Sequence, residues 1–198
     1  MVVADQMTKM LPHLMAASRA AEMTPYGVFL AKLQRFVAES MISHSALRNV
    51  GAAGAVQRAR DFLALLSLRG LHRVKSAGYL SWLDSNTERL RLSLPPPAQR
   101  WGAARKAMNI FMRSVTYTTP LAEAYRLQHL LPYLEVPLDR DVAIGLKMRQ
   151  GNTVAVWKSI VSLTPDIHRR YQRAAMCDAQ ERRVHRADLD VFYWRQKK

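Results

Sequence analysis

The sequence predicts an all-α protein. Alanine, leucine, methionine and arginine dominate the 198 residues, and runs of alternating β-branched residues are almost absent. Apolar residues also recur at helical spacing in several segments. Hydrophobic residues make up 49% of the chain, whereas glycine and proline number only 8 and 9, so the chain can bury a substantial core. That core fits one domain or two small lobes.

Two helices are predicted in the first part of the chain, from a capping residue and from the spacing of apolar residues. Thr24 and Pro25 are typical of an N-cap followed by a first-turn proline, and the apolar spacing after them predicts a helix to about Met41. The small-residue segment 49–56 predicts a connection. A second helix is expected after it, because apolar residues again fall on one stripe: Ala59, Phe62, Leu63 and Leu66.

Two glycines and a proline-rich segment predict the next boundaries. Gly70 and Gly78 predict breaks on either side of LHRVKSA, with a short helix from about Tyr79. The segment 94–99, LPPPAQ, predicts a rigid connection, because consecutive prolines cannot continue a helix.

The segment WGAARKAMNIFMRSV, residues 101–115, predicts an amphipathic helix. Its apolar residues share one stripe: Ala104, Ala107, Met108, Phe111 and Val115. Lys106, Asn109 and Arg113 are expected on the other side, where they face solvent or a cleft.

Further helices are expected in the last third of the chain. One covers residues 120–130, one begins near Asp139 after an extended segment, and one begins at Thr164 with Pro165. The segment VHRADLDVFYWR near the end fits a helix or a strand. We favour a helix, because nothing nearby would pair with a strand.

The charge of the chain indicates a polyanionic partner. Thirty Lys and Arg against fifteen Asp and Glu give a net charge of +15 and a pI near 10.6. Most of the cations are arginine, whose planar guanidinium suits phosphate, so nucleic acid is favoured over an acidic protein. A membrane partner is not expected, since no apolar run is long enough to span a bilayer.

The cysteine and histidine content argues against a metal centre. A single cysteine, Cys177, excludes disulfide frameworks and clusters held by several cysteines, and it fits the cytoplasm. The six histidines offer no pair at metal-ligand spacing, and the N-terminus lacks the pattern of a secretory signal. We therefore expect a cytoplasmic protein without a metal or cofactor.

Two motifs carry a family resemblance. GAARKAMN, residues 102–109, and VPLDRDVAIGLK, residues 136–147, together resemble the helix-hairpin-helix DNA glycosylase superfamily. The matching residues are Gly102, Arg105, Lys106 and Asn109 in the first motif and Leu138, Asp139 and Val142 in the second. The chain departs from the family pattern at Trp101, Ala104 and Asp141, and the interval from Lys106 to Asp139 is longer than is usual there.

The resemblance implies a fold, a site and a partner. The fold is two helical lobes with a cleft between them: residues 28–118, ending in the hairpin-helix motif, and residues 1–27 together with 119–198. Lys106 is the implied amine nucleophile at the sugar C1′, and Asp139 stabilises the developing sugar cation. The expected contacts to double-stranded DNA are Arg100, Trp101, Gly102, Arg105, Asn109, Arg113 and Arg140. Trp101, Tyr79 and Trp82 are candidates for stacking on a base or wedging into the duplex.

The leading hypothesis is a DNA glycosylase that flips out and excises a damaged or modified base, in repair or in defence against phage. AP lyase activity would accompany base release where Lys106 forms a Schiff base. The alternative is a non-catalytic basic helical protein that binds DNA or RNA through phosphates, and a third class is an interaction protein with acidic partners. Simpler roles also stay open for Lys106 as a solvated helix lysine, and for Asp139 as an N-cap.

Overall fold

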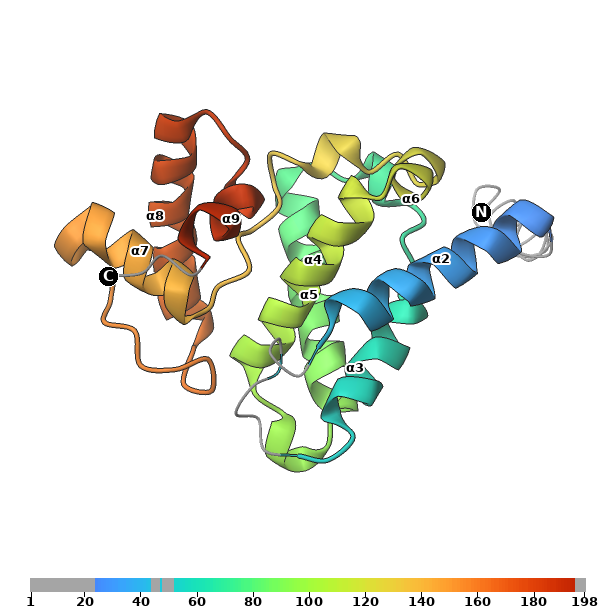
Figure 1. The fold of residues 1–198 in the computed structure, drawn as a ribbon, viewed down its shortest axis with the longest axis horizontal. Coiled ribbons are helices and arrows are strands. Elements are labelled where there is room, and N and C mark those ends of the chain that lie inside the picture. The colour runs from blue at the N-terminus through green and yellow to red at the C-terminus, as the bar shows by residue number, and fades with distance from the viewer. Residues whose placement is uncertain (1–23, 44–46, 48–51, 195–198) are drawn as a thin grey trace, which may run out of the picture.

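The computed structural model describes residues 24–43, 47 and 52–194, and over these residues the protein is all-helical. The predicted all-α class is therefore confirmed. Figure 1 shows two groups of helices side by side, connected by residues 131–139. None of the helices in the described ranges is long and apolar enough to cross a membrane.

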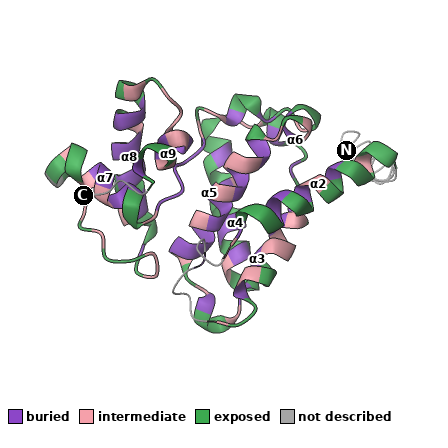
Figure 2. Ribbon diagram, in the orientation of Figure 1, coloured by how far each residue is buried: buried purple, intermediate pink, exposed green. Residues whose placement is uncertain are grey.

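The first lobe is built around a central helix. It contains α2 (Pro25–Met41), α3 (Ala55–Ala64), α4 (Ser76–Ser93), α5 (Trp101–Tyr117) and α6 (Thr119–Ala124). Thr24 caps α2 as predicted, because its side chain accepts a hydrogen bond from the backbone N–H of Gly27 at 3.0 Å. The predicted apolar stripe of α5 is fully buried: Ala104, Ala107, Met108, Phe111 and Val115. Figure 2 shows buried residues along α4 and α5, in the middle of this lobe.

The second lobe is smaller. It contains α7 (Arg140–Gln150), α8 (Pro165–Arg182) and α9 (Leu189–Tyr193), and its core includes Leu146, Tyr171 and Leu189. Thr164 caps α8. The segment near the C-terminal end contains α9 and is therefore helical. Both results agree with the sequence-based predictions.

Two helix boundaries differ from the predictions. Gly78 lies inside the first turn of α4, so the break expected there is wrong. The predicted helix 120–130 is divided, because α6 ends at Ala124 and Arg126 adopts a positive φ of 52° before a short 3-10 turn, Gln128–Leu130. A left-handed residue cannot continue a right-handed helix.

The boundary between the lobes lies near Glu135 rather than at residue 118. One buried core runs from Leu30 to Leu134, with Ala187 as its only later member among the described residues, and the other runs from Val136 to Tyr193. The segment after α5 stays in the first lobe because its leucines pack into the first core: Leu121, Leu127, Leu130 and Leu134. Of the N-terminal residues assigned to the second lobe, 1–23 lie outside the described residues, and 24–27 belong to the start of α2.

Candidate active site

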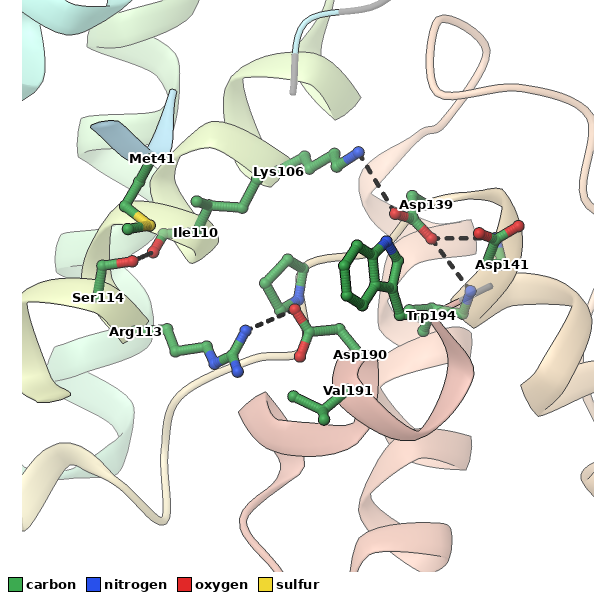
Figure 3. A pocket seen from close by; sticks show the side chains of 12 residues that line it. Met41, Lys106, Ile110, Arg113, Ser114, Asp139, Asp141, Asp190, Val191 and Trp194 are labelled. Carbon is green, nitrogen blue, oxygen red and sulfur yellow. Dashed lines mark hydrogen bonds and ion pairs between the residues drawn. The ribbon is translucent and has the colours of Figure 1, made fainter. Parts of the chain in front are cut away.

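A pocket of about 490 Å³ opens between the two lobes. Met41 and one face of α5 form one wall, and residues 137–142 and 190–194 of the second lobe form the other. In Figure 3 the side chains of Lys106 and Arg113 on α5 point across the pocket toward Asp139 and Asp190 of the facing wall. The volume is within the range typical of small-molecule sites.

Lys106 and Asp139 meet across this pocket. The Nζ of Lys106 lies 3.5 Å from Oδ2 of Asp139, although the two residues are far apart in the chain. The lysine side chain is 12% exposed and the aspartate side chain 40% exposed, so solvent and ligands reach the pair mainly from the aspartate side. The two residues proposed from separate motifs therefore share one site.

Asp139 also holds the start of α7. Its other carboxylate oxygen, Oδ1, accepts hydrogen bonds from the backbone N–H groups of Asp141 at 3.0 Å and Val142 at 3.1 Å. The N-cap role expected as the simpler alternative is thus real, and it leaves Oδ2 directed at Lys106 (Figure 3). Because both oxygens are engaged, the carboxylate has a fixed orientation in the pocket.

A second ion pair crosses the same pocket. Nη1 of Arg113 donates to Oδ2 of Asp190 at 2.5 Å, and Nε of Arg113 lies 3.8 Å from Asp188. Burial raises the pKa of the Asp190 carboxyl, although Arg113 acts against this shift. Arg113 was predicted to contact DNA, but in this structure its guanidinium is paired with carboxylates of the second lobe.

The structure corrects the placement of Arg105 and Asn109. Both were expected at the DNA surface, and Asn109 on the same side as Lys106, but they are only 3% and 2% exposed. Both donate to Glu135, the Nε of Arg105 at 2.8 Å and the Nδ2 of Asn109 at 3.1 Å. The pocket face of α5 consists instead of Lys106, Ile110, Arg113 and Ser114. A buried side chain with these partners is not available to a phosphate.

The remaining residues predicted to bind DNA have different surroundings. Gly102 is buried, and a Cβ there would lie 2.4 Å from the carbonyl oxygen of Ile160, so its role is to let α5 pack closely against the segment that precedes α8. Trp101 is half-buried, edge-to-face with the His168 ring and within 5.5 Å of the Arg105 guanidinium. Arg100 and Arg140 are exposed, each at the start of a helix.

The aromatic residue at the pocket is Trp194, which is not among the predicted stacking residues. Trp194 lines the pocket and is 68% exposed (Figure 3), whereas the stacking candidate Tyr79 is fully buried and Trp82 is half-buried. Met41 and Asp190 were also not predicted as site residues. The only local signal for Trp194 is its place near the end of the last predicted helix, and that does not show which surface it faces.

Comparison with known proteins gives no assignment: no family model, curated protein or solved structure matches this chain. The likeness to helix-hairpin-helix DNA glycosylases therefore stays a prediction that rests on the two motifs. The structure adds that both motifs contribute residues to one pocket, Lys106 from the first and Asp139 from the second.

Proposed function

We propose that the protein is a DNA glycosylase that excises a base from a nucleotide extruded into the pocket between the lobes. The observation that carries the proposal is the approach of the Lys106 amine to the Asp139 carboxylate, at 3.5 Å, inside a pocket large enough for a nucleobase. A glycosylase-like arrangement of two lobes with the site between them is part of the same proposal.

The two side chains suit the two halves of the reaction. The neutral amine of Lys106 attacks the sugar C1′, the C1′–N bond breaks, and the base leaves with the bonding electron pair and takes up a proton. As the base departs, the fixed negative charge of Asp139 stabilises the cationic sugar. Once Nζ is bonded to C1′, the same carboxylate is near enough to accept the proton that Nζ then loses. Opening of the sugar ring then gives a Schiff base between C1′ and Nζ, from which β-elimination nicks the strand.

The lining of the pocket and the charge of the chain suit DNA. The exposed indole of Trp194 offers a stacking surface for a planar base, and Ile110 and Val191 add apolar side chains to the lining. Outside the pocket, Arg170 and Arg173 on α8 are exposed, and the chain carries a net charge of +15. Arginines of this kind bind phosphates without reading the sequence.

The test is covalent trapping. Duplex DNA with an abasic site, and a panel of duplexes with oxidised, deaminated, alkylated or hypermodified bases, is incubated with the protein and sodium borohydride. We expect a reduced covalent adduct with the wild type, which Lys106→Ala abolishes. Lys32→Ala is the matched control, because Lys32 is also a helix lysine but is exposed on α2, outside the pocket.

Two outcomes would contradict the proposal. If the adduct still formed in Lys106→Ala, Lys106 would not be the nucleophile. Duplex binding without adduct or base release on any substrate would favour the non-catalytic DNA-binding alternative. In that case Lys106→Ala would only weaken binding and lower its salt dependence, by about one unit of slope.

A further inference from the structure

We propose that Glu135 is a positioning residue that fixes one lobe against the other and thereby sets the distance between Lys106 and Asp139. Its consequence for catalysis rests on the function proposed above, but its effect on the lobes does not. The residues that carry the inference are called the Glu135 cluster here: Glu135, Arg105, Asn109 and His168.

Glu135 receives hydrogen bonds from both lobes. From α5 of the first lobe, Arg105 donates through Nε at 2.8 Å and Nη2 at 3.2 Å, and Asn109 donates through Nδ2 at 3.1 Å. From α8 of the second lobe, Nε2 of His168 lies 2.8 Å from Oε2 of Glu135. One carboxylate at the boundary of the two cores therefore joins a helix of each lobe.

The cluster is connected directly to the two site residues. Arg105 precedes Lys106 on α5, and Glu135 lies four residues before Asp139. The segment between Glu135 and Asp139 is also held, because the Gln172 side chain bonds both the N–H of Val136, at 3.1 Å, and its carbonyl, at 2.8 Å. A displacement at Glu135 would consequently change the gap across the pocket.

Burial makes these contacts strong. Glu135, Arg105, Asn109 and His168 are each 5% exposed or less. Burial alone would raise the pKa of Glu135, yet the facing His168 and Arg105 outweigh it and hold this pKa well below its usual range. Removing the carboxylate charge would leave the Arg105 guanidinium buried with Asp84 as its one acidic partner among the residues that the structure describes. A buried charge deprived of its partner is far more costly than a lost surface pair.

The protein offers a matched control carboxylate. Asp178 is fully buried and is bonded by Tyr193 at 2.5 Å and Arg182 at 3.0 Å, with Arg149 alongside. All of these partners lie in the second lobe, on α7, α8 and α9. Asp178→Asn therefore removes a comparable buried charge without touching the boundary between the lobes.

The test measures the distance between the lobes by pulsed electron paramagnetic resonance. The single native cysteine, Cys177, is exposed on α8, and Ser85→Cys adds a second exposed label on α4. In this doubly labelled protein we expect Glu135→Gln to shift or broaden the distance distribution and Asp178→Asn to leave it unchanged. Asn109→Ala keeps every charge of the cluster, and we expect it to shift the distance distribution less, in the same direction. This variant replaces Glu135→Gln in the measurement if Glu135→Gln does not fold.

Single-turnover trapping supplies the catalytic readout. At saturating abasic DNA we expect the adduct to form roughly a hundredfold more slowly in Glu135→Gln, with a much smaller change in the DNA concentration at half saturation, because misplacement of about an ångström has effects of that size. An unchanged distance distribution in Glu135→Gln and Asn109→Ala, or an equal change in Asp178→Asn, would overturn the inference. The distance measurement needs no turnover, so failure of the proposed glycosylase chemistry would be recognised separately.

Discussion

Asp139 carries two roles on one side chain, and its two oxygens separate them. Oδ1 completes the hydrogen bonding of the first turn of α7, whereas Oδ2 faces the Lys106 amine. An N-cap needs an acceptor oxygen but no charge, since asparagine caps helices as well as aspartate does. Stabilisation of a sugar cation needs the charge.

Substitutions at Asp139 should therefore separate its contribution to stability from its contribution to activity. We expect Asp139→Asn to retain the cap and unfold within about 0.5 kcal/mol of the wild type, and Asp139→Ala to lose about 1 kcal/mol. Both variants should release base at least roughly a hundredfold more slowly. Thermal unfolding and single-turnover base release measure the two effects. If Asp139→Asn released base at the wild-type rate, Asp139 would act only as the N-cap of α7.

At the scale of the helices, close packing holds each lobe in shape. In the second lobe, α9 lies so close to α7 that a Cβ on Gly145 would be 2.1 Å from Cδ1 of Tyr193. The residues that follow Pro137 and those at the end of α9 form one wall of the pocket, so this contact shapes the site as well as the core.

Gly145→Ala should consequently destabilise the protein by about 1 to 3 kcal/mol, because the Tyr193 ring and α9 must move. Gly78→Ala is the control: Gly78 is exposed in the first turn of α4, and its new Cβ would meet only the end of the Val74 side chain. There alanine's helix preference offsets the contact, and we expect a change within about 1 kcal/mol. Urea unfolding compares the two. Equal destabilisation would contradict the packing described for α7 and α9.

Helix starts and apolar stripes were predictable because their causes are local. Thr24 and Thr164 cap the helices that follow them, and the stripe of α5 is set by residues within four positions of one another. The continuation of α4 through Gly78 was not predictable, because tertiary packing outweighs the modest cost of a glycine in a helix.

The partners of the site residues depend on the fold of the whole chain. Lys106 and Asp139 were proposed from their motifs, but their separation across a pocket could not be derived from spacing. Arg105 and Asn109 were placed at a DNA surface because nothing near them in sequence indicates Glu135, 30 and 26 positions away. Trp194 was missed for the same reason, since the pocket exists only where the lobes meet.

At the scale of the whole molecule, the Glu135 cluster predicts a pH dependence of stability. The pKa of Glu135 is lowered by folding from an ordinary value of 4.5, so the folded state binds fewer protons than the unfolded state below that pH. The stability contributed by Glu135 is fully present above about pH 4.5 and is lost as the pH falls through its folded pKa.

The difference in unfolding free energy between wild type and Glu135→Gln should therefore be at its full value above about pH 4.5 and should narrow as the pH falls below that value. Urea unfolding at a series of pH values measures it, with Lys32→Ala as a variant that should follow the wild type throughout. A difference that stays constant with pH would mean that the Glu135 charge does not hold the lobes together.

The most direct measurement of the central claim is the identification of the residue that becomes bonded to DNA. The borohydride-reduced adduct is digested with a protease and a nuclease, and the modified peptide is sequenced by mass spectrometry. We predict a sugar remnant on Nζ of Lys106. A remnant on any other residue, or no modified peptide from DNA that the protein binds and cleaves, would contradict it.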